Sequence, residues 1–166
     1  MGLWGTIKGW LNIGGVKVLL WKYKEPLSRS NPVMQGAVLL KTKSDKTVNS
    51  VEVKVVEEYT YTEEEDGEKK KKTDTKVLGS IKFPNPADPG LGYPLELKPG
   101  QDREQKFSFP VALTQRLQDK KGVLGGIGKL AAFAGGEKVE IYLVAEASVK
   151  GAAFNTSDRQ KLTIGD

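Results

Sequence analysis

The sequence predicts an all-β fold in which two antiparallel sheets pack face to face as a sandwich. Two observations lead to this prediction. Apolar and polar residues alternate with a period of two along several segments, as expected of strands with one buried face. Turn-forming residues separate these segments at short intervals, which is typical of a sandwich of about seven or eight strands.

The most regular alternation lies near the C-terminus. Every odd position from 139 to 149 is apolar, whereas Glu140 and Glu146 mark the opposite face. This pattern predicts a half-buried strand. Tyr142 and Val144 interrupt its polar face, so we expect the middle of that face to be partly covered.

Two further segments predict a long β-hairpin. Odd positions are apolar or aromatic in 51–61, with Glu57 as the charged exception, and again in 77–83, which includes Val77. A two-residue turn at Asp66 and Gly67 would pair odd positions with even ones and expose one of the two apolar sets. The alternation therefore predicts a three- or five-residue loop with a left-handed Gly67.

The charged run between these two strands is interpreted as a solvated hairpin tip. Glu63 to Asp66 precede Lys69 to Lys72, and a five-residue loop would set Glu64 opposite Lys70 and Glu63 opposite Lys71. Opposite charges this close largely cancel beyond a Debye length of about 8 Å. A nucleic-acid or lipid patch is the less favoured interpretation of this run.

Shorter segments are also predicted as strands and complete the sandwich. They are Val16–Lys22, Ala37–Lys43, Tyr93–Leu97, Arg103–Phe109 and Gln160–Ile164. Turn residues separate them, notably in the proline-rich stretch 84–94 and at Pro99 and Gly100.

Residues 1–13 predict a short amphipathic helix rather than a strand. The apolar side chains of this segment fall within about 120° of arc on a helical wheel. These candidate contact residues are Leu3, Trp4, Ile7, Trp10 and Leu11. Glycines on the opposite side cost about 1 kcal/mol each in helix propensity, so we expect the helix to need a surface on which to form. That surface is either the sandwich itself, or a membrane or a groove of a partner protein.

The segment 115–136 also does not alternate like a strand. Its glycine-rich apolar part predicts a loop that leads into a short helix at 129–134. It is not a phosphate-binding loop, because Gly128 and Lys129 are followed by Leu130 instead of Ser or Thr. We interpret the segment as an apolar loop packed under the sandwich, with a second membrane or partner contact as the alternative.

Composition limits the classes of function. The chain of 166 residues has no Cys and no His, which removes thiolate chemistry, the side chain best suited to proton transfer near neutral pH, and the commonest neutral metal ligand. We therefore expect no catalytic site, no metal and no cofactor. The net charge of +5 comes from 26 basic and 21 acidic residues, a mixture that does not suggest a nucleic-acid partner.

Location follows from absences in the sequence. No apolar stretch approaches the about 20 residues that a membrane-spanning helix needs. The first residues lack the charged, apolar and cleavage regions of a secretory signal. The lack of Cys fits a reducing compartment. We expect a cytoplasmic protein that associates with a membrane, if at all, at the surface.

Four stretches, taken in order, resemble the arrestin-like family, and within it the bacterial sporulation-control proteins. They are Ile13-Gly14-Gly15 before the first strand, NPVMQGAVLLK at 31–41, LELKPGQDREQKFSFPVAL at 95–113, and YLVAEASVKGAAFNTSDRQKLTI at 142–164. The resemblance implies an arrestin-like, immunoglobulin-like sandwich that acts as an adaptor or regulator of protein partners without a cofactor. The family carries two sandwiches, whereas this sequence accounts for one.

We therefore expect an N-terminal amphipathic segment over 1–13 and a single β-sandwich domain over 14–166. The expected function is that of a non-enzymatic, arrestin-like adaptor whose N-terminal segment attaches to a membrane or a partner. The alternative is a structural domain that forms homo-oligomers by pairing its sheet edges. A hydrolase that uses two carboxylates is a third hypothesis, although no Asp or Glu pair in the sequence stands out for that role.

Overall fold

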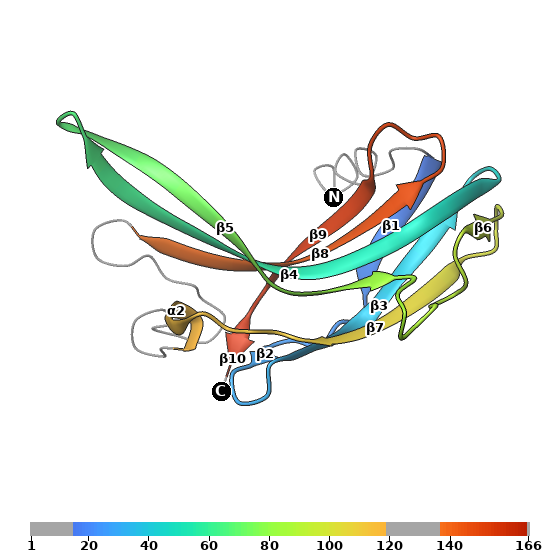
Figure 1. Ribbon diagram of the computed structural model, residues 1–166, viewed down its shortest axis with the longest axis horizontal. Coiled ribbons are helices and arrows are strands. Elements are labelled where there is room, and N and C mark those ends of the chain that lie inside the picture. The colour runs from blue at the N-terminus through green and yellow to red at the C-terminus, as the bar shows by residue number, and fades with distance from the viewer. Residues whose placement is uncertain (1–14, 119–136, 166) are drawn as a thin grey trace.

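Two antiparallel sheets form a β-sandwich in the computed structural model, which describes residues 15–118 and 137–165 (Figure 1). One sheet has the order β1 (Val16–Trp21), β3 (Val33–Thr42), β7 (Arg103–Pro110). The larger sheet has the order β5 (Glu68–Phe83), β4 (Lys46–Glu65), β8 (Lys138–Val149), β9 (Thr156–Leu162), and β6 (Leu95–Leu97) also pairs with β4. β2 (Leu27–Ser28) and β10 (Ile164–Gly165) form a small parallel pair. The prediction of an all-β sandwich is confirmed.

Two of the sequence predictions fall wholly or partly outside the residues that the structure describes. The amphipathic helix predicted for 1–13 lies outside the described residues, and so does the short helix predicted at 129–134. The loop predicted from the glycine-rich part of that segment also lies outside the described residues, and the described start of the segment is a one-turn helix, α2 (Gln115–Gln118). Leu117 is buried in the core, which explains why this turn packs against the sandwich.

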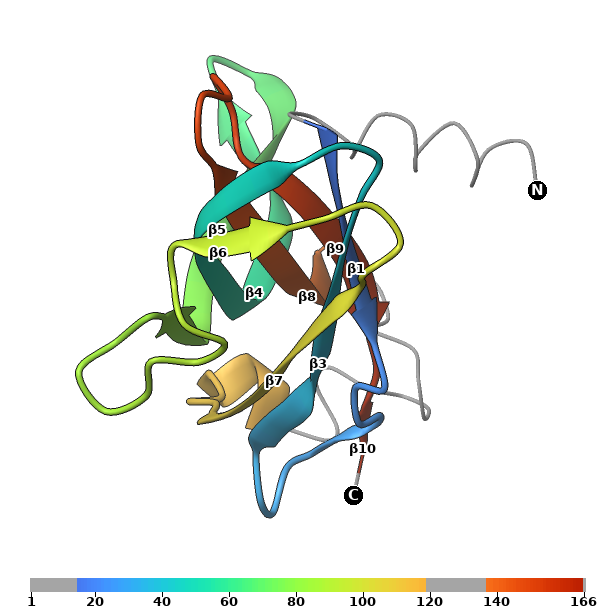
Figure 2. The same cartoon turned by 90° about the vertical axis from the view of Figure 1, so that its right-hand side faces the viewer.

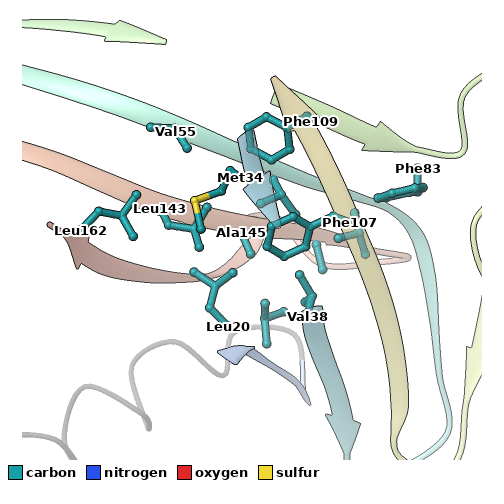
Figure 3. Close-up of a cluster of buried hydrophobic side chains, with 14 of the residues drawn as sticks. Leu20, Met34, Val38, Val55, Phe83, Phe107, Phe109, Leu143, Ala145 and Leu162 are labelled. Carbon is teal, nitrogen blue, oxygen red and sulfur yellow. The ribbon is translucent and has the colours of Figure 1, made fainter. Parts of the chain in front are cut away.

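The core lies between the two sheets and is built from the alternating faces of their strands. The predicted inward face of β8 is buried at every odd position. Figure 3 shows Leu143 and Ala145 of β8 in one cluster with Phe107 and Phe109 of β7 and with Met34 of β3. Each fully buried side chain of this size contributes about 1.5–3 kcal/mol to stability, so this cluster holds the two sheets together.

Side chains of β9 close one side of the sandwich. The backbone N–H of Leu20 donates to Asp158 Oδ2 at 2.8 Å, and the Thr156 hydroxyl donates to the backbone carbonyl of Val16 at 3.0 Å. Both β9 residues are buried. The edge of β1 thus finds hydrogen-bond partners on β9 without forming a ladder with it.

On the other side of the sandwich, the two sheets are joined where their backbones come close together. The N–H of Ala112, just after β7, donates to the carbonyl of Leu78 in β5 at 2.8 Å. A Cβ at position 79 would lie 2.4 Å from the Pro110 carbonyl oxygen, so Gly79 is needed for the two strands to come this close.

The β4–β5 hairpin has a two-residue turn, and the predicted three- or five-residue loop is wrong. Glu65 pairs with Glu68, which leaves Asp66 and Gly67 as the turn residues. Both have left-handed backbones, with φ of 54° and 78°, as the tight turns of β-hairpins require. Glu64 consequently lies opposite Lys69 instead of the predicted Lys70.

A β-bulge restores the parity that the turn breaks. Val55 pairs with Gly79, but Val56 pairs with Val77, so Leu78 is an extra residue in β5. On the sandwich side of the bulge odd positions pair with odd ones, as predicted, whereas on the tip side they pair with even ones. Leu78 takes the buried position and Val77 is 52% exposed, so the predicted inward placement of Val77 is wrong.

Candidate functional site

The outer face of the three-stranded sheet carries apolar side chains that face away from the core. Figure 2 shows β1, β3 and β7 lying side by side. Because successive side chains on a strand point to opposite faces, the register sets cross-strand rows on the outer face. The rows are Trp21–Ala37–Lys106, then Leu19–Leu39–Glu104, then Lys17–Lys41. We call Leu19, Trp21 and Leu39 the outer apolar strip.

Trp21 is the most exposed member of the outer apolar strip, at 36%. The next residue, Lys22, has a left-handed backbone with φ of 52°. Its Nζ lies 4.3 Å from the centroid of the Trp21 ring and 3.4 Å from Glu104 Oε2. Lys22 therefore both covers part of the indole and neutralises a carboxylate of the neighbouring row.

The charge of this face is positive. Lys22 pairs with Glu104, and Lys41 pairs with Asp102 at 3.4 Å. The lysines of the face are Lys17, Lys22, Lys41, Lys43 and Lys106. Counted over the described residues, five lysines against two acidic residues give a net charge of +3 around the apolar strip.

Two shallow hollows flank the outer apolar strip. The first, of about 230 Å³, is lined by Gly15, Lys17, Lys41, Thr42, Lys43 and Asp102, and we call it the lysine hollow. The second, of about 370 Å³, lies at the opposite end of the face and includes Lys22, Ala37, Glu104 and Lys106. The face therefore combines an apolar centre with basic ends, an arrangement that suits a surface with apolar and anionic layers.

The outer face of the larger sheet has a different character, because its charges pair with one another. Lys54 lies 3.1 Å from Glu146, and Arg159 lies 2.7 Å from Glu58. The Arg159 guanidinium also lies 3.8 Å from the centroid of the Tyr142 ring, which explains how the predicted interruption of the polar face is covered. This is an ordinary solvated sheet face with one aromatic ring under a cation.

Glu140 lies at the edge of that paired surface and has a shifted pKa. Burial raises its pKa, but hydrogen bonds from Lys138, Lys161 and Tyr142 outweigh burial and lower the pKa from 4.5 to about 2. The pKa of Tyr142 moves the other way, to about 12, because of burial and its hydrogen bond to Glu140. Both groups keep their usual charge at neutral pH, so the shifts reflect a structural cluster.

The charged exception that the sequence marked, Glu57, holds the base of the hairpin. Its buried carboxylate accepts hydrogen bonds from the Thr114 hydroxyl at 2.6 Å and from Arg116 Nη2 at 3.1 Å. The Arg116 guanidinium lies 4.0 Å from the centroid of the Tyr59 ring. Glu57 thus ties β4 to α2, as Asp158 ties β9 to β1, and both buried carboxylates have structural partners.

Other kinds of site find no support in the described part of the chain. No group of three or more Asp or Glu side chains within 15–118 and 137–165 is placed to hold a metal ion. Within the same ranges no helix is long and apolar enough to cross a membrane.

The candidate residues from the sequence and those from the structure do not overlap. Leu3, Trp4, Ile7, Trp10 and Leu11 lie outside the described residues, so their placement stays a prediction. The outer apolar strip was missed, although the sequence holds a signal for it. VLLW at 18–21 and AVLL at 37–40 are continuous apolar runs, which indicate strands with two apolar faces.

No protein-family model matches the sequence, and no curated protein matches it. Among solved structures, the sporulation control protein Spo0M from Bacillus subtilis aligns with 93% of this chain at a TM-score of 0.55. This chain has a Spo0M-like fold. The sequences are 18% identical, so the likeness shows the fold alone, and it supports the arrestin-like resemblance at that level. The alignment covers 51% of Spo0M, so the chain spans about half the length of that protein.

Proposed function

We propose that this chain is a non-enzymatic adaptor or regulatory binding domain that attaches to a membrane surface and recognises protein partners. The observation that supports attachment is the outer face of the three-stranded sheet, where an apolar strip is surrounded by lysines. Indole and leucine side chains favour the boundary between headgroups and acyl chains, and lysines favour anionic headgroups.

The N-terminal segment is the second part of the proposed membrane attachment. Residues 1–13 lead directly into Gly15 and β1, the first strand of the sheet that carries the strip. In this proposal Leu3, Trp4, Ile7, Trp10 and Leu11 form the amphipathic anchor that the sequence predicts. The anchor and the strip then contact one membrane from neighbouring parts of the chain.

The regulatory, non-enzymatic part of the proposal has its own support. The chain lacks His and Cys, and the buried carboxylates of Glu57 and Asp158 are occupied by structural hydrogen bonds. A chain without His and Cys, whose two buried carboxylates have structural partners and whose fold resembles that of a sporulation control protein, is best explained as one that acts by binding. A cytoplasmic location fits this role.

Vesicle co-sedimentation tests the proposal. The full chain should pellet with vesicles that contain anionic phospholipid, and a Trp4→Ala, Trp10→Ala double variant should lose most of that binding, because each lost indole removes apolar area from the anchor. Phe154→Ala is the matched control, since Phe154 is 72% exposed on the loop between β8 and β9. Circular dichroism should show that all variants remain folded. If the full chain stays in the supernatant, membrane attachment is ruled out and the predicted helix is better explained as part of the sandwich.

A further inference from the structure

We propose that the outer face of the three-stranded sheet is itself a lipid-binding surface, and that the lysine hollow receives the phosphate of an anionic phospholipid. This inference rests on the proposed function and adds the site and the class of lipid to it.

The lysine hollow has the charge and size for a headgroup phosphate. Among the described residues, three lysines, Lys17, Lys41 and Lys43, and one acidic residue, Asp102, line a volume of about 230 Å³. The described side chains that line the hollow thus include more basic than acidic groups, and Lys41 pairs with Asp102 at 3.4 Å. An anionic phosphate placed there gains charge-assisted hydrogen bonds.

Backbone geometry fixes the floor of the lysine hollow. Gly15 has φ of +81°, and a Cβ there would lie 2.8 Å from the Cε of Lys46. The Thr42 hydroxyl donates to the Gly15 carbonyl at 3.1 Å and so joins the start of β1 to the end of β3. The lysines therefore project from backbone that is held in place, which lowers the ordering cost of binding a phosphate.

The outer apolar strip lies where the acyl chains of such a lipid would begin. Along β1 and β3 the lysine row is followed by the Leu19–Leu39 row and then by Trp21, each step being about 7 Å. Lys106 forms the far end of the face. A nucleic acid would need no apolar centre, whereas a bilayer surface presents an anionic layer next to an apolar one. The face thus matches a membrane that contains anionic lipid.

Charge reversal on the face tests the site. The variant is Lys43→Glu, Lys106→Glu, and its matched control is Lys76→Glu, Lys82→Glu on β5; all four lysines are exposed, and the net charge changes equally. Each lysine near an anionic surface strengthens attachment about fivefold. The face variant should bind phosphatidylglycerol-containing vesicles at least about tenfold more weakly than the control variant. Vesicles of phosphatidylcholine alone should bind both variants equally weakly.

Tryptophan fluorescence tests the apolar strip. The chain has three tryptophans, so a Trp4→Phe, Trp10→Phe variant reports on Trp21 alone. Its emission should move to shorter wavelength when phosphatidylglycerol-containing vesicles are added. An unchanged emission from vesicle-bound protein would overturn the inference, because Trp21 would then remain in water.

The outcomes separate this inference from the proposed function. If the face variant binds as well as its control while Trp4→Ala, Trp10→Ala does not bind, the inference fails and the proposed function stands. If the full chain does not bind vesicles at all, both fail. If Trp21 is already shielded without vesicles, and deletion of residues 1–13 exposes it, then the N-terminal segment covers the strip and the inference is overturned.

Discussion

Charged side chains that face the protein interior or its crevices are held by several partners at once, and Glu140 illustrates this at the scale of a residue. Its pKa of about 2 lies below the ordinary 4.5, so the carboxylate contributes stability that is complete above about pH 4.5 and is lost as the pH falls toward 2. Both lysine partners are half-exposed, and solvent therefore reduces the effect.

Glu140→Gln should lower the free energy of unfolding at pH 7 by on the order of 1–2 kcal/mol, and by clearly less at pH 2.5. Urea unfolding at the two pH values measures both differences. Glu96→Gln, at an exposed position of β6, should have no effect at either pH. An equal loss for Glu140→Gln at both pH values would mean that the ionised carboxylate is not the source of the stability.

Single residues also show what a sequence pattern can and cannot reveal. The alternation of β4 identified Glu57 as a charged residue on an inward face, and the structure confirms its burial. Its partners Thr114 and Arg116 are 57 and 59 positions away, so no local pattern could identify them. The position of a buried charge can be predicted from local periodicity, but its partners depend on the tertiary fold.

At the scale of an element, the β4–β5 hairpin shows that alternation predicts the register of two strands but not the position of a bulge. The pairing of Val51 with Phe83 and of Val53 with Ile81 follows from the predicted odd-to-odd register. An odd-numbered loop and a bulge restore that register equally well. Since Val77 and Leu78 are both apolar, the sequence did not show which of them would be the extra, inward-facing residue.

The tip of this hairpin should be dispensable for folding, whereas the bulge should not. Beyond the Thr60–Lys138 pair, the two strands pair with no other strand within the described residues. Replacing residues 62–71 by Asn-Gly joins the paired Tyr61 and Lys72 through a two-residue turn and should change the melting temperature by no more than about 3 °C. Deleting Leu78 alone should cost about 3 kcal/mol, because a buried side chain is lost and the bulge is lost with it.

Thermal unfolding followed by circular dichroism compares the two hairpin variants. The larger deletion should have the smaller effect. If removing the tip is as damaging as deleting Leu78, then the tip takes part in the cooperative fold.

At the scale of the whole molecule, the sandwich was predictable but the closure of its sides was not. Alternation gives strands and buried faces, whereas the contact from Leu20 to Asp158 joins residues 138 positions apart. The outer apolar strip was visible in the sequence as runs without alternation. Only the pairing of β1, β3 and β7 showed that the residues of the strip lie together on one face of the sheet.

The closed sides of the sandwich argue against the alternative function, self-assembly through sheet edges. The edge of β1 is bonded to side chains of β9, and β5 is joined to the segment after β7 at Leu78. Beyond the sandwich, the edge of β5 carries Lys69 to Lys72, and lysines on an edge strand oppose pairing with another chain. We therefore expect the chain to be monomeric.

Light scattering from about 10 µM to 1 mM should give a constant mass near 18.1 kDa for the full chain. Lys69→Val, Lys71→Val places apolar β-branched residues on one face of the hairpin tip and should produce association that grows with concentration. Glu64→Val alone should have a smaller effect, because it leaves Lys69 to Lys72 in place on the edge of β5. Concentration-dependent growth of the unmodified chain would instead favour assembly through sheet edges over the adaptor proposed here, since its own lysines would then fail to protect the edge.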